Sequence, residues 1–320
     1  MSSCLILGGG GYIGGNWARR LAAQKRFDRI VLADVRAPAQ PPATGTEFVE
    51  CDVRKPLVLG GLKPEWIFNF AAVHREPGHA REEYFDTNLA GAKNVCAFAG
   101  QSGCKNIFFT SSIAVYGALD QPVTEASRPY PTTPYGISKL CAELIHKGWR
   151  RSEAGRRLCI CRPGVIYGPG DPGNILRMIR AIRKGYFVFP GSKHLRKSYG
   201  YIEGLLDSFE FIMAREESQL TYNYVERETE TLGTLVEIIQ THLGKKTPAF
   251  TAPLPVLVAM ARLAQLATGG RSPVHPVRVR KTASSTHVVP ATLLQLGFKF
   301  RFDFTDSLKD WAKKTPEDFF

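Results

Sequence analysis

Residues 4–15 read CLILGGGGYIGG, a short apolar run that leads directly into a turn rich in glycine. The amphipathic segment YIGGNWARRLAAQ begins inside this turn. A strand, a glycine turn and a helix in this order are typical of the first unit of a dinucleotide-binding sheet. The glycines permit a tight turn and a close approach of the backbone to a pyrophosphate. The free N–H groups of the helix N-terminus would then face the phosphates.

The glycines fit two overlapping spacings, Gly9-x-Gly11-x-x-Gly14 and Gly8-x-x-Gly11-x-x-Gly14. Asp34 ends the next predicted strand, twenty residues beyond Gly14. A carboxylate at this place can accept hydrogen bonds from the adenosine ribose, which favours NAD over NADP. Arg36 is close enough to accommodate a 2′-phosphate, so NADP remains the alternative. The turn and Asp34 together predict a site for NAD.

Short apolar runs alternate with helical segments along the first half of the chain. The predicted strands are 4–7, 29–34, 47–52, 66–72, 106–112 and 157–168, and the predicted helices include 81–101 and 135–152. This alternation predicts an α/β fold with a doubly wound parallel sheet. We predict a Rossmann-type NAD-binding domain over 1–168, with a return of the chain near 199–215, and a smaller mixed α/β substrate lobe over 169–320.

Composition favours a globular protein of the cytoplasm. The chain has 320 residues, 44% of them hydrophobic, which is ample for a large core. Its start has no basic region of the kind that opens a signal peptide. The seven cysteines are odd in number and scattered, which argues against a disulfide framework and favours a reducing compartment.

The positive charge is unevenly distributed. The formal net charge is +13, and the segment 238–302 has nine Lys or Arg but no Asp or Glu. A second run without acids, 177–197, holds seven further cations. Such charge suits a phosphate-bearing substrate, an anionic membrane or a solvated surface. Because the cations are not interleaved with aromatic residues, we predict no nucleic-acid partner.

The segment PLPVLVAMARLAQLA (253–267) predicts an amphipathic helix that is too short to span a bilayer. We interpret it as a helix that packs against the substrate lobe. An interfacial contact with a membrane is the alternative. No transmembrane segment is predicted.

The stretch TPYGISKLCAE (133–143) places Tyr135 and Lys139 four positions apart, on one face of a helix. A nearby ammonium lowers the pKa of a tyrosine and makes proton exchange with an alcohol feasible. Ser111 and Ser112 end a predicted strand, at the edge where open α/β sheets bind ligands. Asn88 lies on the predicted helix 81–101, where its amide could steady the site or a nearby backbone.

These motifs occur in the order of a known family. The chain resembles the extended short-chain dehydrogenase/reductases, and is most similar to their NAD-dependent epimerase/dehydratase branch, which acts on nucleotide sugars. The resemblance covers about 4–215. It rests on the glycine turn and Asp34, and on the stretches CDV (51–53), FAA (70–72), TNLAG (87–91), TSSIAVYG (110–117), Tyr135-x-x-x-Lys139 and RPGVIYGPGD (162–171).

The resemblance implies a role for each matching residue. Tyr135 is the expected acid/base, Lys139 lowers its pKa and binds a ribose, and Ser112 holds the substrate oxygen. The expected cofactor contacts are Gly8, Gly11, Tyr12 and Ile13 at the pyrophosphate, Asp34 at the adenosine ribose, Asp52 and Val53 at the adenine, Ala71, Ala72 and Asn88 along the dinucleotide, and Pro163 near the nicotinamide.

The resemblance also implies substrate contacts. Lys197 falls where many members carry a phosphate-binding arginine, and Asn174 and Arg280 are further candidates. His74 lies in the loop after the fourth strand and could hydrogen-bond the sugar. Pro77 and Gly78 disrupt the helix that a metal site of His74 and its neighbours would need, so no metal is predicted.

Three reactions share this kind of site. A 4,6-dehydratase normally has Asp-Glu directly after the catalytic hydroxyl, where this chain has Ile113 and Ala114. We therefore predict an NAD-dependent nucleotide-sugar 4-epimerase. An NAD(P)-dependent dehydrogenase or ketoreductase of a sugar or a 3β-hydroxysteroid-like alcohol is the alternative, because Val165 replaces the asparagine that holds the diphosphate in many members. A regulatory NAD-binding module without turnover is a third possibility. The family also implies a homodimer.

Overall fold

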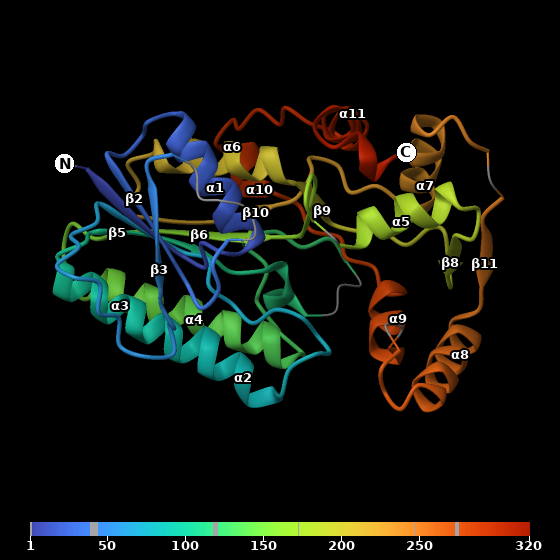
Figure 1. The fold of residues 1–320 in the computed structure, drawn as a ribbon, viewed down its shortest axis with the longest axis horizontal. Coiled ribbons are helices and arrows are strands. Elements are labelled where there is room, and N and C mark those ends of the chain that lie inside the picture. The colour runs from blue at the N-terminus through green and yellow to red at the C-terminus, as the bar shows by residue number, and fades with distance from the viewer. Residues whose placement is uncertain (1, 39–43, 118–120, 172, 247, 273–274) are drawn as a thin grey trace.

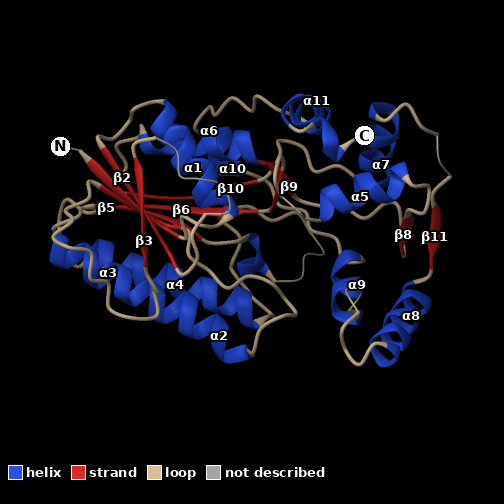
Figure 2. Cartoon of the chain, in the orientation of Figure 1, coloured by secondary structure: helices blue, strands red, loops and turns tan. Residues whose placement is uncertain are grey.

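Seven parallel strands form the central sheet in the part of the chain that the computed structural model describes, residues 2–38, 44–117, 121–171, 173–246, 248–272 and 275–320 (Figures 1 and 2). The strand order is β10-β6-β5-β4-β1-β2-β3. The strands are β1 (Ser3–Leu7), β2 (Arg29–Asp34), β3 (Thr46–Glu50), β4 (Trp66–Asn69), β5 (Asn106–Thr110), β6 (Arg157–Pro163) and β10 (Gln219–Tyr224). The predicted doubly wound α/β fold is therefore confirmed.

Helices cover both faces of this sheet, because successive side chains of a strand point to opposite sides. The helices α1 (Tyr12–Ala23) and α6 (Ile202–Met213) lie on the face that carries Ile6 and Phe108. The helices α3 (Gly91–Ser102) and α4 (Pro134–Arg151) lie on the face that carries Leu5 and Phe109. Figure 1 shows these two layers above and below the strands. Their apolar side chains bury the sheet on both sides.

The helical segment predicted over 81–101 is present but not uniform. It consists of α2 (Arg81–Phe85), a π-helical turn η1 (Asp86–Ala90) and α3. The π turn contains Asn88, and such turns are often found at functional sites.

The strand predicted over 157–168 is divided in two. β6 ends at Pro163, and β7 (Val165–Tyr167) pairs instead with β9 (Tyr199–Tyr201) in a separate small sheet. The break falls at Gly164, where a Cβ atom would lie 2.4 Å from the carbonyl oxygen of Ser198. The chain can therefore change direction only because this residue has no side chain.

After β7 the chain forms a smaller α/β region and also returns to the sheet. It returns through α6 and β10, and β10 lies beyond the predicted range 199–215. The remaining elements are α5 (Asn174–Arg183), β8 (Val188–Pro190), α7 (Leu232–His242), β11 (Phe250–Ala252), α8 (Leu254–Ala267), α9 (Pro276–Thr282), α10 (Ala291–Gln295) and α11 (Phe304–Lys314). All seven cysteines are free thiols. In the described ranges, none of the helices has the length and apolarity needed to cross a bilayer.

Candidate active site

The site lies where β5 ends and α4 begins. Thr133 caps α4 by accepting a hydrogen bond from the backbone N–H of Gly136 at 3.2 Å, and Pro134 fixes the first helical position. A Cβ atom on Gly136 would lie 2.4 Å from the carbonyl oxygen of Ala114, in the short 3₁₀ turn η2 (Ile113–Tyr116). Helix and turn can approach this closely only with glycine here. The approach brings Tyr135 beside Ser112.

The side chains of Ser112 and Tyr135 lie close together, and Ser112 acts to lower the pKa of Tyr135. The Oγ of Ser112 accepts the backbone N–H of Ala114 at 3.1 Å, which leaves its own proton available for a second acceptor. Burial outweighs the effect of Ser112 and raises the pKa of Tyr135 to about 12. In the protein without ligands, Tyr135 is therefore a protonated phenol at neutral pH.

Lys139 lies one helical turn beyond Tyr135 and is 1% exposed. Its Nζ atom lies 4.5 Å from the centre of the Phe109 ring, on the adjacent strand β5. Burial lowers the pKa of Lys139 to about 7, and the nearby carboxylate of Glu143 limits the fall. The ammonium is thus desolvated and held in place by an aromatic ring.

His146 supports Phe109 from the helix. The two rings stack with their centres 4.3 Å apart. Nδ1 of His146 lies 2.7 Å from the carbonyl oxygen of Ala142, and Nε2 lies 3.3 Å from Nδ2 of Asn69. Both bonds are satisfied when Nδ1 carries the proton. Burial lowers the pKa of His146 to about 4, so the imidazole that supports Phe109 is uncharged at neutral pH.

Asn88 holds two segments of the site together. Its amide oxygen accepts the backbone N–H of Val73, and its amide nitrogen donates to the carbonyl oxygen of the same residue, both at 3.0 Å. The nitrogen also lies 2.9 Å from Oγ of Ser138, which donates to the carbonyl oxygen of Tyr135. The π turn thereby fixes the loop after β4 against α4. The hydrogen-bonding atoms of Asn88 contact the protein itself, so its geometry is that of a positioning residue.

The glycine turn fits a dinucleotide. Gly8 has φ +78°, and a Cβ atom there would lie 2.6 Å from the backbone nitrogen of Ala71. Gly11 is the N-cap residue of α1, so no side chain there bonds to the N–H groups of the first turn. That turn also carries no acidic residue. The N-terminus of α1, with Tyr12 and Ile13, therefore presents its backbone and dipole to an incoming phosphate. These residues fit the pyrophosphate of NAD.

Asp34 ends β2 beside this turn. Its Oδ2 atom accepts the backbone N–H of Gly10 at 3.0 Å, and its Oδ1 atom accepts that of Arg36 at 3.3 Å. The carboxylate is partly exposed and remains able to accept further hydrogen bonds. These features fit the ribose of an adenosine.

The other predicted cofactor residues lie at or just beyond the carboxyl ends of the strands. Asp52 and Val53 follow β3, Ala71 and Ala72 follow β4, and Pro163 is the last residue of β6. Arg54 donates from its guanidinium to Asp52 and lowers the pKa of that carboxyl. The residues thus share one edge of the sheet, where ligands bind in open α/β folds.

The predicted substrate residues are less closely grouped. His74 is exposed in the loop after β4, Asn174 is the exposed first residue of α5, and Arg280 is exposed on α9. Lys197 donates to the carbonyl oxygens of Lys281 and Ser284, at the end of α9. Burial lowers the pKa of Lys197 to about 8. The ammonium of Lys197 is therefore engaged with a helix C-terminus.

The loop after β4 contacts α9 through residues 76 and 77. Lys281 forms an ion pair with Glu76, and a guanidinium nitrogen of Arg278 donates to the carbonyl oxygen of Pro77 at 3.0 Å. Among the described residues, no group of three His, Cys, Asp or Glu side chains is arranged to hold a metal ion.

Sequence reasoning missed a buried ion pair next to the predicted catalytic residues. Arg162 on β6 contacts Glu143 on α4, and its Nη1 atom donates to the hydroxyl of Tyr116 at 2.9 Å. Tyr116 in turn donates to Oδ1 of Asn223 on β10 at 2.8 Å. Two signals were available: Glu143 lies four residues after Lys139, and Arg162 follows the apolar run LCIC. A charged side chain on a buried strand requires a buried partner of opposite charge, because an unpaired charge is costly to remove from water.

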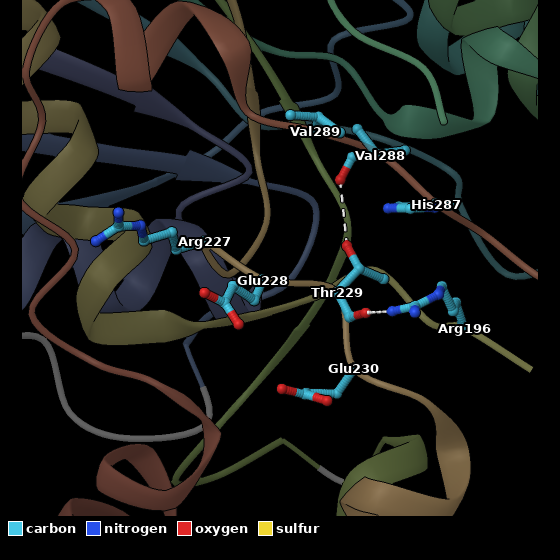
Figure 3. A pocket seen from close by; sticks show the side chains of 8 residues that line it. All are labelled: Arg196, Arg227, Glu228, Thr229, Glu230, His287, Val288 and Val289. Atoms are coloured by element: carbon cyan, nitrogen blue, oxygen red, sulfur yellow. Dashed lines mark hydrogen bonds between the residues drawn. The ribbon is translucent and has the colours of Figure 1, made fainter. Parts of the chain in front are cut away.

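A pocket of about 450 Å³ lies outside this constellation (Figure 3). It is lined by Arg196, Arg227, Glu228, Thr229, Glu230, His287, Val288 and Val289. Figure 3 shows the hydroxyl of Thr229 bonded to the carbonyl oxygen of Val288, and Arg196 bonded to the carbonyl oxygen of Thr229. Charges of both signs surround it, and none of the predicted site residues is part of this lining. We therefore do not assign the active site to this pocket.

The chain is similar to known proteins over much of its length. Residues 4–224 match the model of the NAD dependent epimerase/dehydratase family. An N-acetyl-alpha-D-glucosaminyl-diphospho-ditrans,octacis-undecaprenol 4-epimerase from Escherichia coli O157:H7 is 31% identical over 258 residues, which cover 75% of this chain and 78% of that protein. A UDP-glucose 4-epimerase from Lacticaseibacillus casei is 34% identical over 181 residues, 53% of each chain.

The fold also matches solved structures. MoeE5, in complex with UDP-glucose and NAD, superposes with a TM-score of 0.76 at 20% identity, and the match covers 99% of both chains.

Proposed function

The chain belongs to the NAD dependent epimerase/dehydratase family, and we propose that it is an NAD-dependent 4-epimerase of a diphosphate-linked sugar. One observation carries this proposal. Tyr135 and Lys139 lie on one face of α4, with Ser112 beside Tyr135 at the carboxyl edge of the sheet. That edge also carries the glycine turn and Asp34. An acid/base pair beside a dinucleotide site suits the oxidation and re-reduction of a secondary alcohol.

In the proposed reaction Ser112 holds the C4 hydroxyl of the sugar, and the phenolate of Tyr135 removes its proton. A bound NAD would supply the redox chemistry at C4, first as hydride acceptor and then as hydride donor. Between the two the 4-keto sugar would turn over to present its other face, and Tyr135 would return the proton to the C4 oxygen. Lys139 stabilises the phenolate and donates to a ribose hydroxyl. The balance is closed, because each proton and hydride taken is given back.

The composition of η2 disfavours dehydration. A dehydratase requires a second acid and base to remove water from the neighbouring carbons. Ile113 and Ala114 follow Ser112 here, and neither can transfer a proton. The residues present therefore suit oxidation and re-reduction of the sugar, but not the removal of water.

The substrate class follows from the relatives. The Escherichia coli protein is named for a sugar on an undecaprenyl diphosphate, and the Lacticaseibacillus casei protein for UDP-glucose. Both substrates carry the sugar on a diphosphate. We propose this shared group, with a nucleotide sugar as the first substrate to test. Lys197, Asn174, Arg280 and His74 are the proposed substrate contacts.

The first experiment is to denature the purified protein and assay the supernatant for nicotinamide nucleotide. An epimerase retains its cofactor through each cycle, so we expect close to one NAD per chain. The protein is then incubated with UDP-linked sugars, and the configuration at C4 is followed by NMR. Epimerised product without net NADH supports the proposal. Stoichiometric NADH and an oxidised sugar would refute it.

One observation favours a dehydrogenase as a second candidate. Val165, which replaces the asparagine of many nucleotide-sugar members, is 42% exposed at the start of β7. An apolar side chain there suits an apolar alcohol. A protein that is purified without cofactor and oxidises a sugar or hydroxysteroid with free NAD would have this function.

A further inference from the structure

The outward side of α8 is an exposed apolar surface. Val256, Met260, Leu263 and Leu266 are 50, 61, 65 and 79% exposed, and their spacing places them on one side of the helix. We call these four residues the α8 face. Val258 and Ala261 on the other side are buried. Apolar side chains on two sides of a helix are normally both covered, but α8 has protein on one side only.

The position of α8 leaves this face accessible. Figure 1 shows α8 at the lower right edge of the molecule, with α9 between it and the helices around the sheet. Exposed apolar patches of this kind mark interaction sites.

The surroundings of the α8 face are basic. Arg262 lies on α8 itself, Arg271 follows the helix, and Arg278 and Arg280 lie on the neighbouring helix α9, all of them exposed. The sequence 238–302 has no Asp or Glu that could neutralise them. Such a surface matches an anionic lipid bilayer. The apolar side chains suit its acyl chains, and the bordering cations suit its phosphates.

We propose that the α8 face docks the protein on an anionic lipid bilayer. The helix has 14 residues and is about 21 Å long, which is less than the roughly 30 Å of a hydrocarbon core. It therefore lies along the headgroup boundary, with Met260, Leu263 and Leu266 inserted and Arg262 at the phosphates. This role goes beyond the catalytic function proposed above. Its test measures lipid binding and does not depend on turnover.

Charge argues against a second copy of the chain as the occupant. A two-fold dimer through this surface would bring the same patch of both copies together. The basic patch of Arg262, Arg271 and Arg280 on one copy would then face the same patch on the other, and the segment 238–302 offers no carboxylate between them. An anionic lipid surface would place negative charge beside these arginines and reduce their mutual repulsion. A second copy would add further positive charge and increase it.

Docking would also orient the substrate side of the site. Arg278 and Lys281 on α9 bind the loop 76–78, and Lys197 binds the end of the same helix. The α8 face is thus one helix away from the predicted substrate contacts. A diphosphate-linked sugar at a membrane surface would reach the site from this side.

The test is co-sedimentation of the full-length protein with vesicles. One set contains phosphatidylcholine alone, and the other equal parts of phosphatidylcholine and phosphatidylglycerol. We expect binding to the anionic set, weakened by added salt. The variant Met260→Gln/Leu263→Gln/Leu266→Gln should bind roughly tenfold more weakly or worse, because the inserted apolar area is lost. The variant Arg262→Gln/Arg271→Gln should lose most of its salt dependence.

The matched control is Val58→Gln/Leu144→Gln, which replaces apolar residues that are 87 and 60% exposed elsewhere. It should bind like the unaltered protein. Circular dichroism checks that each variant is folded. Equal sedimentation of the triple variant and the unaltered protein would overturn the proposal, and so would a failure of the unaltered protein to bind anionic vesicles. A triple variant that changes from dimer to monomer in light scattering would identify a second copy as the occupant.

Discussion

Arg162 donates two hydrogen bonds to the carboxylate of Glu143, at 2.8 and 2.7 Å, where the two side chains are only 4 and 0% exposed. The pair joins β6 to α4 directly behind Lys139. Burial acts to raise the pKa of Glu143, but Arg162, together with Ser111 and Lys147, outweighs it and holds the pKa below its usual range. The helix α4, which carries Tyr135 and Lys139, is therefore fixed to the sheet by a charged contact.

Glu143→Gln should destabilise the protein strongly. It leaves the guanidinium of Arg162 buried without a counter-charge, which costs roughly 3–5 kcal/mol of unfolding free energy. Thermal unfolding of the variant measures this. The control is Glu153→Gln, which removes an exposed carboxylate paired with Lys105 and should leave the melting temperature almost unchanged. If Glu143→Met/Arg162→Met is no more stable than Glu143→Gln, the unpaired charge is not the cause.

Tyr135→Phe should abolish turnover without loss of the cofactor. The variant keeps the aromatic ring and removes only the oxygen that exchanges the proton, so kcat should fall by roughly 10²–10⁴-fold. Bound nicotinamide nucleotide is measured after denaturation and should equal that of the unaltered protein. The control is Tyr130→Phe, which removes the hydroxyl of an exposed tyrosine. Full activity in Tyr135→Phe would contradict the proposed mechanism.

Lys139→Met should stabilise the cofactor-free protein, most of all below pH 7. In the folded state the pKa of Lys139 is lowered from 10.5 to about 7, so between these values the unfolded chain binds more protons. Stability of the unaltered protein therefore rises with pH across this window, and below it the burial cost is fully present. The methionine variant lacks this cost. Denaturant unfolding at pH 6 and at pH 10 should show a stability difference that shrinks with rising pH.

Asp34→Asn should weaken the preference for NAD over NADP. The change removes the charge that would bind the adenosine ribose and repel a 2′-phosphate. A hydrogen bond to a charged group contributes about 1.5–3 kcal/mol, so NAD affinity should fall roughly 10- to 100-fold. Calorimetric titration of cofactor-free protein with both nucleotides measures the ratio. Glu50→Gln, at the exposed end of the neighbouring strand β3, is the control. An unchanged ratio would remove Asp34 from the site.

The sequence was sufficient for most of the sheet, because buried parallel strands are short apolar runs between glycine and helix signals. Five of the six predicted strands in the first half closely match β1 to β5. The strand over 157–168 was too long, since the break at Gly164 is imposed by Ser198, far along the chain. β10 was missed because its sequence, QLTYNY, lacks the continuous apolar run that marks the other strands. Its Asn223 is buried only because Tyr116 and Val289 bond to it.

The site was predictable where its residues are close in sequence. A spacing of four predicts that Tyr135 and Lys139 share a helix face, and the glycine turn with Asp34 predicts a nucleotide. The environment of Lys139 was not predictable, because Phe109 and His146 approach it only in the folded chain. The α8 face was similarly ambiguous, since an apolar helix sequence does not say which of its sides the protein covers.

The position of β10 has a consequence for biosynthesis. In the described part of the chain, β6 is paired with β5 on one side and with β10, which ends at Tyr224, on the other. A ribosome that has released residues 1–168 has therefore delivered every residue predicted to bind NAD, but the edge of β6 that β10 covers is still unpaired. During the translation of residues 169–224, this open edge of β6 can pair with other nascent chains. Nascent chains stalled in this interval would be the ones that chaperones retain.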